Sequence, residues 1–184
     1  MEIKAAEVMK LRHATNAGMM DCKNALIEAE GDFDKAVDII RKKGLVVASK
    51  RADREAKEGC VLAVAEGKKG VMVSLNCETD FVAKNENFIN FTRQILDCAL
   101  ANMPADKEAL LALNIEGRSI ADQIAEQTGV IGEKLELAYY GKVEAEATVA
   151  YIHPGNKLAT VIGFNKEADN QVKRDVAMQA AAMA

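Results

Sequence analysis

Apolar residues recur at helical spacing in three successive segments at the start of the chain. In the second and third segments, four apolar residues each follow the spacing i, i+3, i+4, i+7, starting from Cys22 and from Phe33. Gly31 and Gly44 are expected to end these two helices. The first segment, 5–15, is expected to place Ala5, Val8, Met9 and Arg12 on one face, with Leu11 beside it. The pattern predicts a compact module of three short helices.

Residues 49–58 alternate charged residues with alanine and contain no large apolar residue. Because such a segment has no face to bury, it predicts a solvated helical linker. We therefore place a domain boundary near residue 55, with a three-helix domain over 1–55 and a second domain over 56–184.

The period of the apolar pattern changes to two from Cys60 onward. Segments 60–65 and 71–77 flank a glycine-bearing loop and predict a β-hairpin. Three further strands are expected at 135–140, 147–152 and 158–164, the last two joined by the turn that starts at His153.

Helical spacing returns at 85–102, where Phe88, Phe91, Ile95 and Ala99 share a face, and more weakly at 107–113. Ser119 is expected to cap a helix that runs to Gln127 and stops at Gly129. A last helix is expected to begin near Glu167. Its apolar positions are Val172, Val176 and Ala180.

This order of elements predicts an α+β fold, in which the helical domain precedes a core with an antiparallel sheet. Within the core we expect a first subdomain at about 56–145 and part of a second at about 146–184.

The composition limits the classes of function. Of the 184 residues, 49% are hydrophobic and 28% are charged, and the net charge is −4. These values suit a folded core and exclude disorder. No apolar run approaches the roughly 20 residues of a membrane span. A negative net charge does not supply the positive field of nucleic-acid binding, so we expect neither a membrane nor a nucleic acid as direct partner.

Cysteine usage and the start of the chain indicate the compartment. Cys22, Cys60, Cys77 and Cys98 show no CxxC spacing, which favours reduced thiols over disulfides or a zinc site. The first residues form neither a basic signal-peptide region nor an Arg-rich presequence. We therefore expect a cytoplasmic protein.

Residues for catalysis are scarce. His13 and His153 are the two histidines and lie in different predicted domains, which leaves little for a catalytic triad. The phosphate-binding patterns GxxxxGK[ST] and GxGxxG do not occur. The sequence disfavours an enzyme, and no cofactor or metal is expected.

A candidate binding site lies where the second strand of the hairpin ends and a helix begins, at Thr79, Asp80, Phe81 and Val82. In the simpler interpretation Thr79 or Asp80 caps the following turn and Phe81 staples it to the core. In the functional interpretation the Asp80 carboxylate and the Phe81 ring project together as a binding anchor. Local patterns alone favour the first.

Other candidates each have a plain structural alternative. Met19 and Met20 either both pack partially or offer an adaptable contact to a partner. Lys23 is exposed and is either merely solvated or a contact residue. His153 lies at a hairpin tip, where exposure without a role is the simpler interpretation. Ile131, before Gly132, is a core plug or a contact.

Two long motifs occur in order, LRHATNAGMMDCKNALIEAEGDFDKAVDIIRKKG and NCETDFVAKNENF. Together they closely resemble the translation elongation factor Ts family, which opens with TGAGMMDCKKAL…A.GD…A…LR..G and carries TDFVA after a strand. IGEKLEL, the hairpin with His-x-Gly and AMQAAAM extend the resemblance over essentially the whole chain. Asn16 and the turn HPGNK depart from the usual family residues.

The resemblance implies a guanine-nucleotide exchange factor that binds the GTPase elongation factor Tu in its GDP-bound and nucleotide-free forms, without a nucleotide site of its own. It implies a three-helix domain like the ubiquitin-associated (UBA) fold before the α+β core. The Phe81 ring is expected to insert between helices of the GTPase domain, supported by Asp80. The family's contact positions correspond here to Lys23, Asp80, Phe81, Ile131, Gly132 and His153. We also expect Met19, Met20, Thr79 and Val82 to contact this partner.

Two expectations concern the extent of the chain and its alternatives. The apolar end MQAAAMA has no cap or polar tail, which predicts a carboxyl-terminally truncated form of a longer protein. A competing hypothesis is a UBA-like binding module without exchange activity, in which residues 1–55 alone would bind the partner fully. A dimer is a further alternative that the sequence leaves open.

Overall fold

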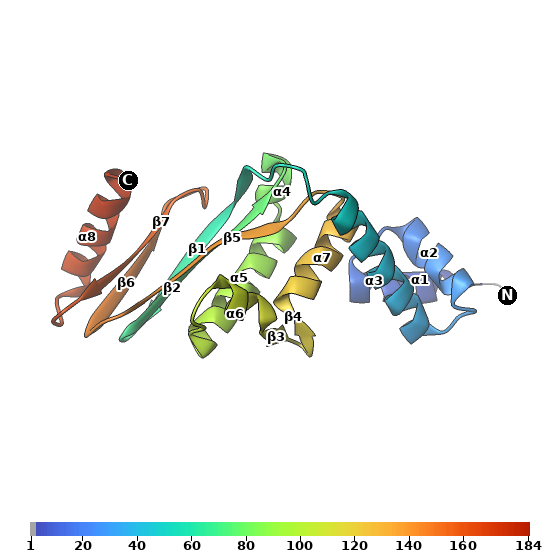
Figure 1. Cartoon of the computed structure of the whole chain (residues 1–184), viewed down its shortest axis with the longest axis horizontal. Helices are drawn as coiled ribbons and strands as arrows, with labels where there is room; N and C mark the ends of the chain where they lie inside the picture. Colours follow the sequence, from blue (N-terminus) through green and yellow to red (C-terminus); the bar gives the residue numbers. More distant parts are fainter. Residues whose placement is uncertain (1–2) are drawn as a thin grey trace. The chain divides into compact units, whose positions relative to one another are not determined.

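The structure is a computed structural model that describes residues 3–184, and Met1 and Glu2 lie outside the described residues. Its elements form two units (Figure 1). The first unit comprises the chain up to Arg54 together with Asp122–Lys134, and the second comprises Glu55–Ala121 and Leu135–Ala184. The prediction had assigned 122–134 to the core domain, so the first unit is larger than a three-helix module.

Three of the helices in the first unit are α1 (Ala5–Thr15), α2 (Met19–Glu28) and α3 (Phe33–Lys50). As predicted from its period, α2 buries its apolar face, and Gly31 follows it with a φ of 84°. The Asp32 carboxylate caps α3 by accepting a hydrogen bond from the Lys35 N–H at 3.0 Å.

The predicted face of α1 is correct at Val8 and at the neighbouring Leu11, and wrong at the other positions. Val8 and Leu11 are buried, whereas Ala5 and Arg12 are exposed and Met9 is 40% exposed. The buried stripe therefore follows the i, i+3 pair of aliphatic residues. Arg12 stays in water because a buried guanidinium without a partner would cost free energy.

The predicted end of α3 at Gly44 is also wrong, because this helix continues to Lys50. The helical linker predicted over 49–58 is not helical beyond Lys50, since residues 51–53 form a turn. Gly44 is buried inside α3, where a β-carbon would lie 3.3 Å from the Cα of Glu126. The glycine therefore does not end the helix. It lets another helix approach α3 closely.

The partner in this approach is α7 (Ile120–Ile131). Gly129 was predicted to stop this helix, but it lies inside it. The end comes at Gly132, whose φ is 79° and whose N–H donates to the Thr128 carbonyl at 2.9 Å.

A three-stranded antiparallel sheet forms the middle of the second unit. Its strands are β1 (Glu58–Glu66), β2 (Lys69–Cys77) and β5 (Glu136–Glu144), in the order β1-β2-β5. The hairpin predicted from the alternating pattern is confirmed. Glu66 pairs with Lys69 across a two-residue turn that starts at Gly67, with a φ of 57°.

One face of this sheet is covered by α5 (Glu86–Asn102). The predicted face of this helix holds, because Phe88, Ile95 and Ala99 are buried and Phe91 is half-buried. After it come α6 (Lys107–Ala112) and a small hairpin of β3 (Asn114–Ile115) and β4 (Arg118–Ser119). The hairpin was not predicted, because two-residue strands are too short to show alternation.

The opposite face of the sheet meets a second hairpin, β6 (Ala147–Ile152) and β7 (Ala159–Phe164). A β-carbon at Gly70 of β2 would lie 2.5 Å from a methyl group of Val161 in β7. The absence of a side chain at Gly70 therefore lets the hairpin pack closely on the sheet. The hairpin is in turn packed against α8 (Asn170–Ala182), as Figure 1 shows. The α+β class with antiparallel pairing is confirmed.

The last helix starts three residues after the expected position, and its two valines do not form its buried face. The helix begins at Asn170, and Val172 and Val176 are 53% and 40% exposed. The buried positions are Lys173, Ala177 and Ala181. Small side chains let α8 lie close to the strands, and the Lys173 ammonium reaches the Glu167 carboxylate at 2.5 Å while its stem is buried.

Within residues 3–184, none of the helices combines the length and the apolar character that crossing a membrane requires.

Candidate partner-binding site

The short helix α4 (Asp80–Ala83) presents the first group of candidate residues. Thr79 is its N-cap, and its hydroxyl oxygen accepts a hydrogen bond from the Val82 N–H at 3.5 Å. Ala83 is buried and Val82 is half-buried, so this side of the helix packs against β1 and β2. The capping interpretation of Thr79 is therefore correct.

The Phe81 side chain does not staple α4 to the core. It is 83% exposed, the largest exposed fraction among the exposed large apolar side chains in the part of the chain that the structure describes. An aromatic ring left in water gives up apolar burial of about 2 kcal/mol. A capped helix turn thus presents the ring to solvent, in the geometry of an anchor for a partner's pocket.

Charged residues surround the base of α4. The Lys84 ammonium donates a hydrogen bond to the Asp80 carboxylate at 2.6 Å. This bond holds the pKa of Asp80 below its ordinary value and raises the pKa of Lys84, while the charge of Lys157 lowers the pKa of Asp80 further. Lys157 is also paired with Glu58.

Replacing Lys84 with alanine is expected to return the pKa of Asp80 toward its ordinary value of 3.8. The pKa of Asp80 is lowered in the folded protein, so its pair with Lys84 stabilises the fold at pH values above the ordinary pKa of Asp80. This stabilisation is lost as the pH falls through the lowered pKa. Nuclear magnetic resonance titration of the Asp80 carboxyl carbon measures the shift, with Lys69→Ala as a control that leaves it unchanged. An Asp80 pKa identical in Lys84→Ala and the parent chain would contradict the pairing.

His153 belongs to the same end of the second unit. It lies in the loop between β6 and β7, where it is exposed and its Nδ1 is 2.9 Å from the Tyr151 hydroxyl oxygen. The Val61 N–H of β1 donates to the Asn156 carbonyl of this loop at 2.8 Å. Lys157 of this loop is paired with Glu58 of β1, and α4 also packs against β1, so the His153 loop and α4 both lie against this strand.

The remaining candidates lie in the first unit. Met19 and Met20 open α2 and are 41% and 66% exposed, and Lys23 is exposed beside them. Ile131 and Gly132 end α7 and are half-buried. Val130, rather than Ile131, packs against the buried core of this unit. Two groups of candidate residues therefore exist, one in each unit.

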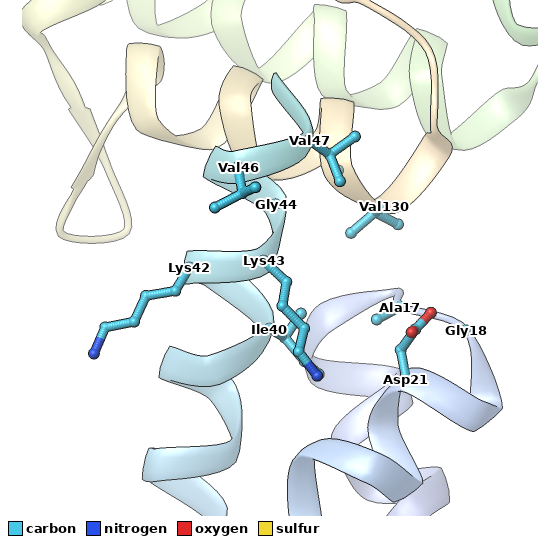
Figure 2. A pocket seen from close by; sticks show the side chains of 11 residues that line it. Ala17, Gly18, Asp21, Ile40, Lys42, Lys43, Gly44, Val46, Val47 and Val130 are labelled. Carbon is cyan, nitrogen blue, oxygen red and sulfur yellow. The ribbon is translucent and has the colours of Figure 1, made fainter. Parts of the chain in front are cut away.

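A groove of about 570 Å³ opens in the first unit between the turn before α2, the middle of α3 and the end of α7 (Figure 2). Met19 and Ile131 directly follow residues that line it. Its lining residues are Ala17, Gly18, Asp21, Ile40, Lys42, Lys43, Gly44, Val46, Val47, Gly129 and Val130.

Sequence reasoning missed this groove because it ended one helix at Gly44 and the other at Gly129. The apolar run Leu45-Val46-Val47 after Gly44 was the signal that α3 continues.

The four cysteines are free thiols, and burial raises the pKa of Cys60 to about 11. Among residues 3–184, no three His, Cys, Asp or Glu side chains gather where they could hold a metal ion.

Comparison with known proteins identifies a family that this chain resembles. The family model described as elongation factor TS matches residues 78–184. This range includes α4 with its exposed ring and the loop of His153.

Curated relatives match over the whole length of the chain. Elongation factor Ts of Porphyromonas gingivalis is 54% identical over 184 residues, which is 100% of this chain and 67% of the relative. That of Christiangramia forsetii is 52% identical over 186 residues, 99% of this chain and 67% of the relative. That of Bacteroides thetaiotaomicron is 50% identical, and the chain covers 56% of its length.

Proposed function

The chain belongs to the elongation factor Ts family, and from this premise we propose that it promotes the release of GDP from the translational GTPase elongation factor Tu. The observation that carries the proposal is the Phe81 ring, 83% exposed on a helix turn capped by Thr79. A rigid aromatic side chain gives a large contact area at a small cost in conformational entropy.

Exchange of this kind needs no covalent step in the factor. A protein that binds the nucleotide-free GTPase more tightly than the GDP-bound form weakens GDP binding by the same factor, because the two equilibria are linked. Each 1.4 kcal/mol of differential contact changes the affinity for GDP about tenfold. We therefore describe the protein as an exchange factor rather than an enzyme, and we assign it no nucleotide or cofactor site of its own.

Each unit contributes a contact surface in this proposal. In the second unit, Phe81 is the wedge that enters the GTPase domain, Asp80 supports it through its carboxylate, and His153 contacts the same partner. Thr79 and Val82 hold α4 in place. The pairing of Asp80 with Lys84 at 2.6 Å and the position of the His153 loop support this arrangement.

In the first unit, Met19, Met20, Lys23, Ile131 and Gly132 contact the same partner. The exposure of the two methionines and of Lys23 supports this assignment. Methionine side chains adapt readily to an apolar partner surface. A translation factor of this kind acts in the cytoplasm.

The affinity of the chain for two forms of elongation factor Tu tests the proposal. Isothermal titration calorimetry is expected to give tighter binding to nucleotide-free elongation factor Tu than to the GDP complex. Equal affinity for both forms would contradict an exchange function. A ligand that binds both states equally does not shift the equilibrium between the GDP-bound and the nucleotide-free form.

Lys23→Ala is expected to weaken binding to elongation factor Tu by roughly five- to tenfold, because an exposed charge at an interface contributes about 1 kcal/mol. Calorimetry against the nucleotide-free GTPase measures the effect. Lys35→Ala is the matched control, since its side chain is also exposed on the first unit. If the Lys23→Ala and Lys35→Ala chains bind equally well, Lys23 lies outside the interface.

The competing hypothesis of a binding module without exchange activity makes a different prediction. It places the whole contact in residues 1–55 and leaves Phe81 without a role. However, the first unit also contains Asp122–Lys134, and Val130 packs against its core. Residues 1–55 therefore lack one part of the unit that this hypothesis requires.

A further inference from the structure

The helices α3 and α7 approach each other at two glycines, Gly44 and Gly129. A β-carbon added at Gly129 would lie 2.1 Å from the Cα of Gly44 and 3.0 Å from its carbonyl carbon and oxygen. No side chain fits at such a distance without moving the backbone. Glycine inside a helix is unfavourable compared with alanine, so close packing accounts for a residue that local preference disfavours at both positions.

Polar contacts join the two segments on either side of this crossing. The Arg41 Nε lies 3.5 Å from the Glu126 Oε1, whose side chain is only 16% exposed. Beyond the end of α7, the Lys134 ammonium donates to the Ala52 carbonyl at 2.8 Å. Together with Val130, which packs against the core of the unit, these contacts fix the end of α7 on the helical module.

We propose that Gly129, packed against Gly44, is a positioning residue that places Ile131 beside the start of α2, so that one partner surface spans both. The inference rests on the proposed function. Its structural basis is the groove of Figure 2, where the end of α7 and the turn before α2 line the same space. Segments far apart in the sequence thereby form a single contact surface.

The two glycines differ in how much room they leave. A β-carbon at Gly129 meets backbone atoms of α3 at 2.1 Å, whereas one at Gly44 meets the Glu126 backbone at 3.3 Å. Gly129→Ala must therefore push α7 away from α3 and displace Ile131. Gly44→Ala requires a smaller shift, and we expect it to have the smaller effect.

The test uses the full chain and nucleotide-free elongation factor Tu. Gly129→Ala is expected to weaken binding by about tenfold or more, and Gly44→Ala by less. Because Gly129 acts through Ile131, the effects of Gly129→Ala and Ile131→Ala on affinity are not expected to add. The double variant is expected to bind elongation factor Tu as tightly as whichever of the two single variants binds less tightly. Gln127→Ala, on the same helix, is the control and is expected to change the affinity by less than about twofold.

A second readout does not depend on the partner. Amide hydrogen exchange of the free chain is expected to become faster at Gly132 and at Val47 in Gly129→Ala, because the crossing is loosened, and to stay unchanged in the second unit. If Gly129→Ala does not fold, amide hydrogen exchange is measured in Gly44→Ala, which disturbs the crossing less.

Three results would overturn the inference: unchanged binding in Gly129→Ala, fully additive effects of Gly129→Ala and Ile131→Ala, or unchanged exchange at the end of α7. If the parent chain does not bind elongation factor Tu, the proposed function fails, whereas the exchange measurement still decides whether Gly129 fixes α7.

Discussion

Replacing Phe81 with alanine is expected to slow the release of GDP from elongation factor Tu by about thirtyfold or more, because an aromatic anchor at an interface is typically worth about 2 kcal/mol or more. The ring is 83% exposed in the free chain, so its removal leaves no cavity in the core. The variant is therefore expected to keep the free energy of unfolding of the parent chain. Loss of exchange without loss of stability is the signature of a contact residue.

Release of a fluorescent GDP analogue, with the chain at substoichiometric concentration, measures the Phe81→Ala effect. Tyr139→Ala is the matched control, because Tyr139 is another exposed aromatic residue of the second unit, at 52% exposure. The control is expected to retain the parent rate. Equal rates for Phe81→Ala and the parent would remove the wedge from the mechanism.

Replacing Leu75 with alanine is expected to have the opposite effect to Phe81→Ala. It lowers stability strongly and has little direct effect on the contact surface. Leu75 lies in the central strand β2 and is fully buried. A cavity at such a position costs about 2–5 kcal/mol. The chain is expected to promote GDP release normally at temperatures where the variant stays folded.

Urea denaturation followed by circular dichroism measures the Leu75→Ala effect. Met72→Ala is the control, because Met72 lies on the same strand but is only half-buried, and a smaller loss is expected. A free energy of unfolding for Leu75→Ala within about 0.5 kcal/mol of the parent, the range typical of surface substitutions, would contradict the packing of β2.

The sequence allowed most elements to be predicted, since periodicity reports burial directly in α2, α5 and the hairpin of β1 and β2. It failed where a local signal competes with a distant contact. Gly44 and Gly129 each suggest a helix end, but each lies inside a helix, where the lack of a side chain lets α3 and α7 approach each other closely. No local pattern contains that information.

The same limit applied to helix faces and to the candidate site. Val172 and Val176 follow an apolar pattern, yet α8 is packed through its alanines. Local patterns favoured a buried Phe81, because apolar rings are usually packed in a core. Only the structure shows it exposed. The motif resemblance identified the candidate residues, whereas the grouping of Ile131 with α2 in one unit required the fold.

The most direct test of the exchange function is the rate of GDP release from elongation factor Tu, measured with a trace of this chain and an excess of unlabelled nucleotide. The proposed exchange function predicts faster release, with each molecule of the chain acting on many molecules of the GTPase. Release at the spontaneous rate, at every concentration of the chain, would contradict it.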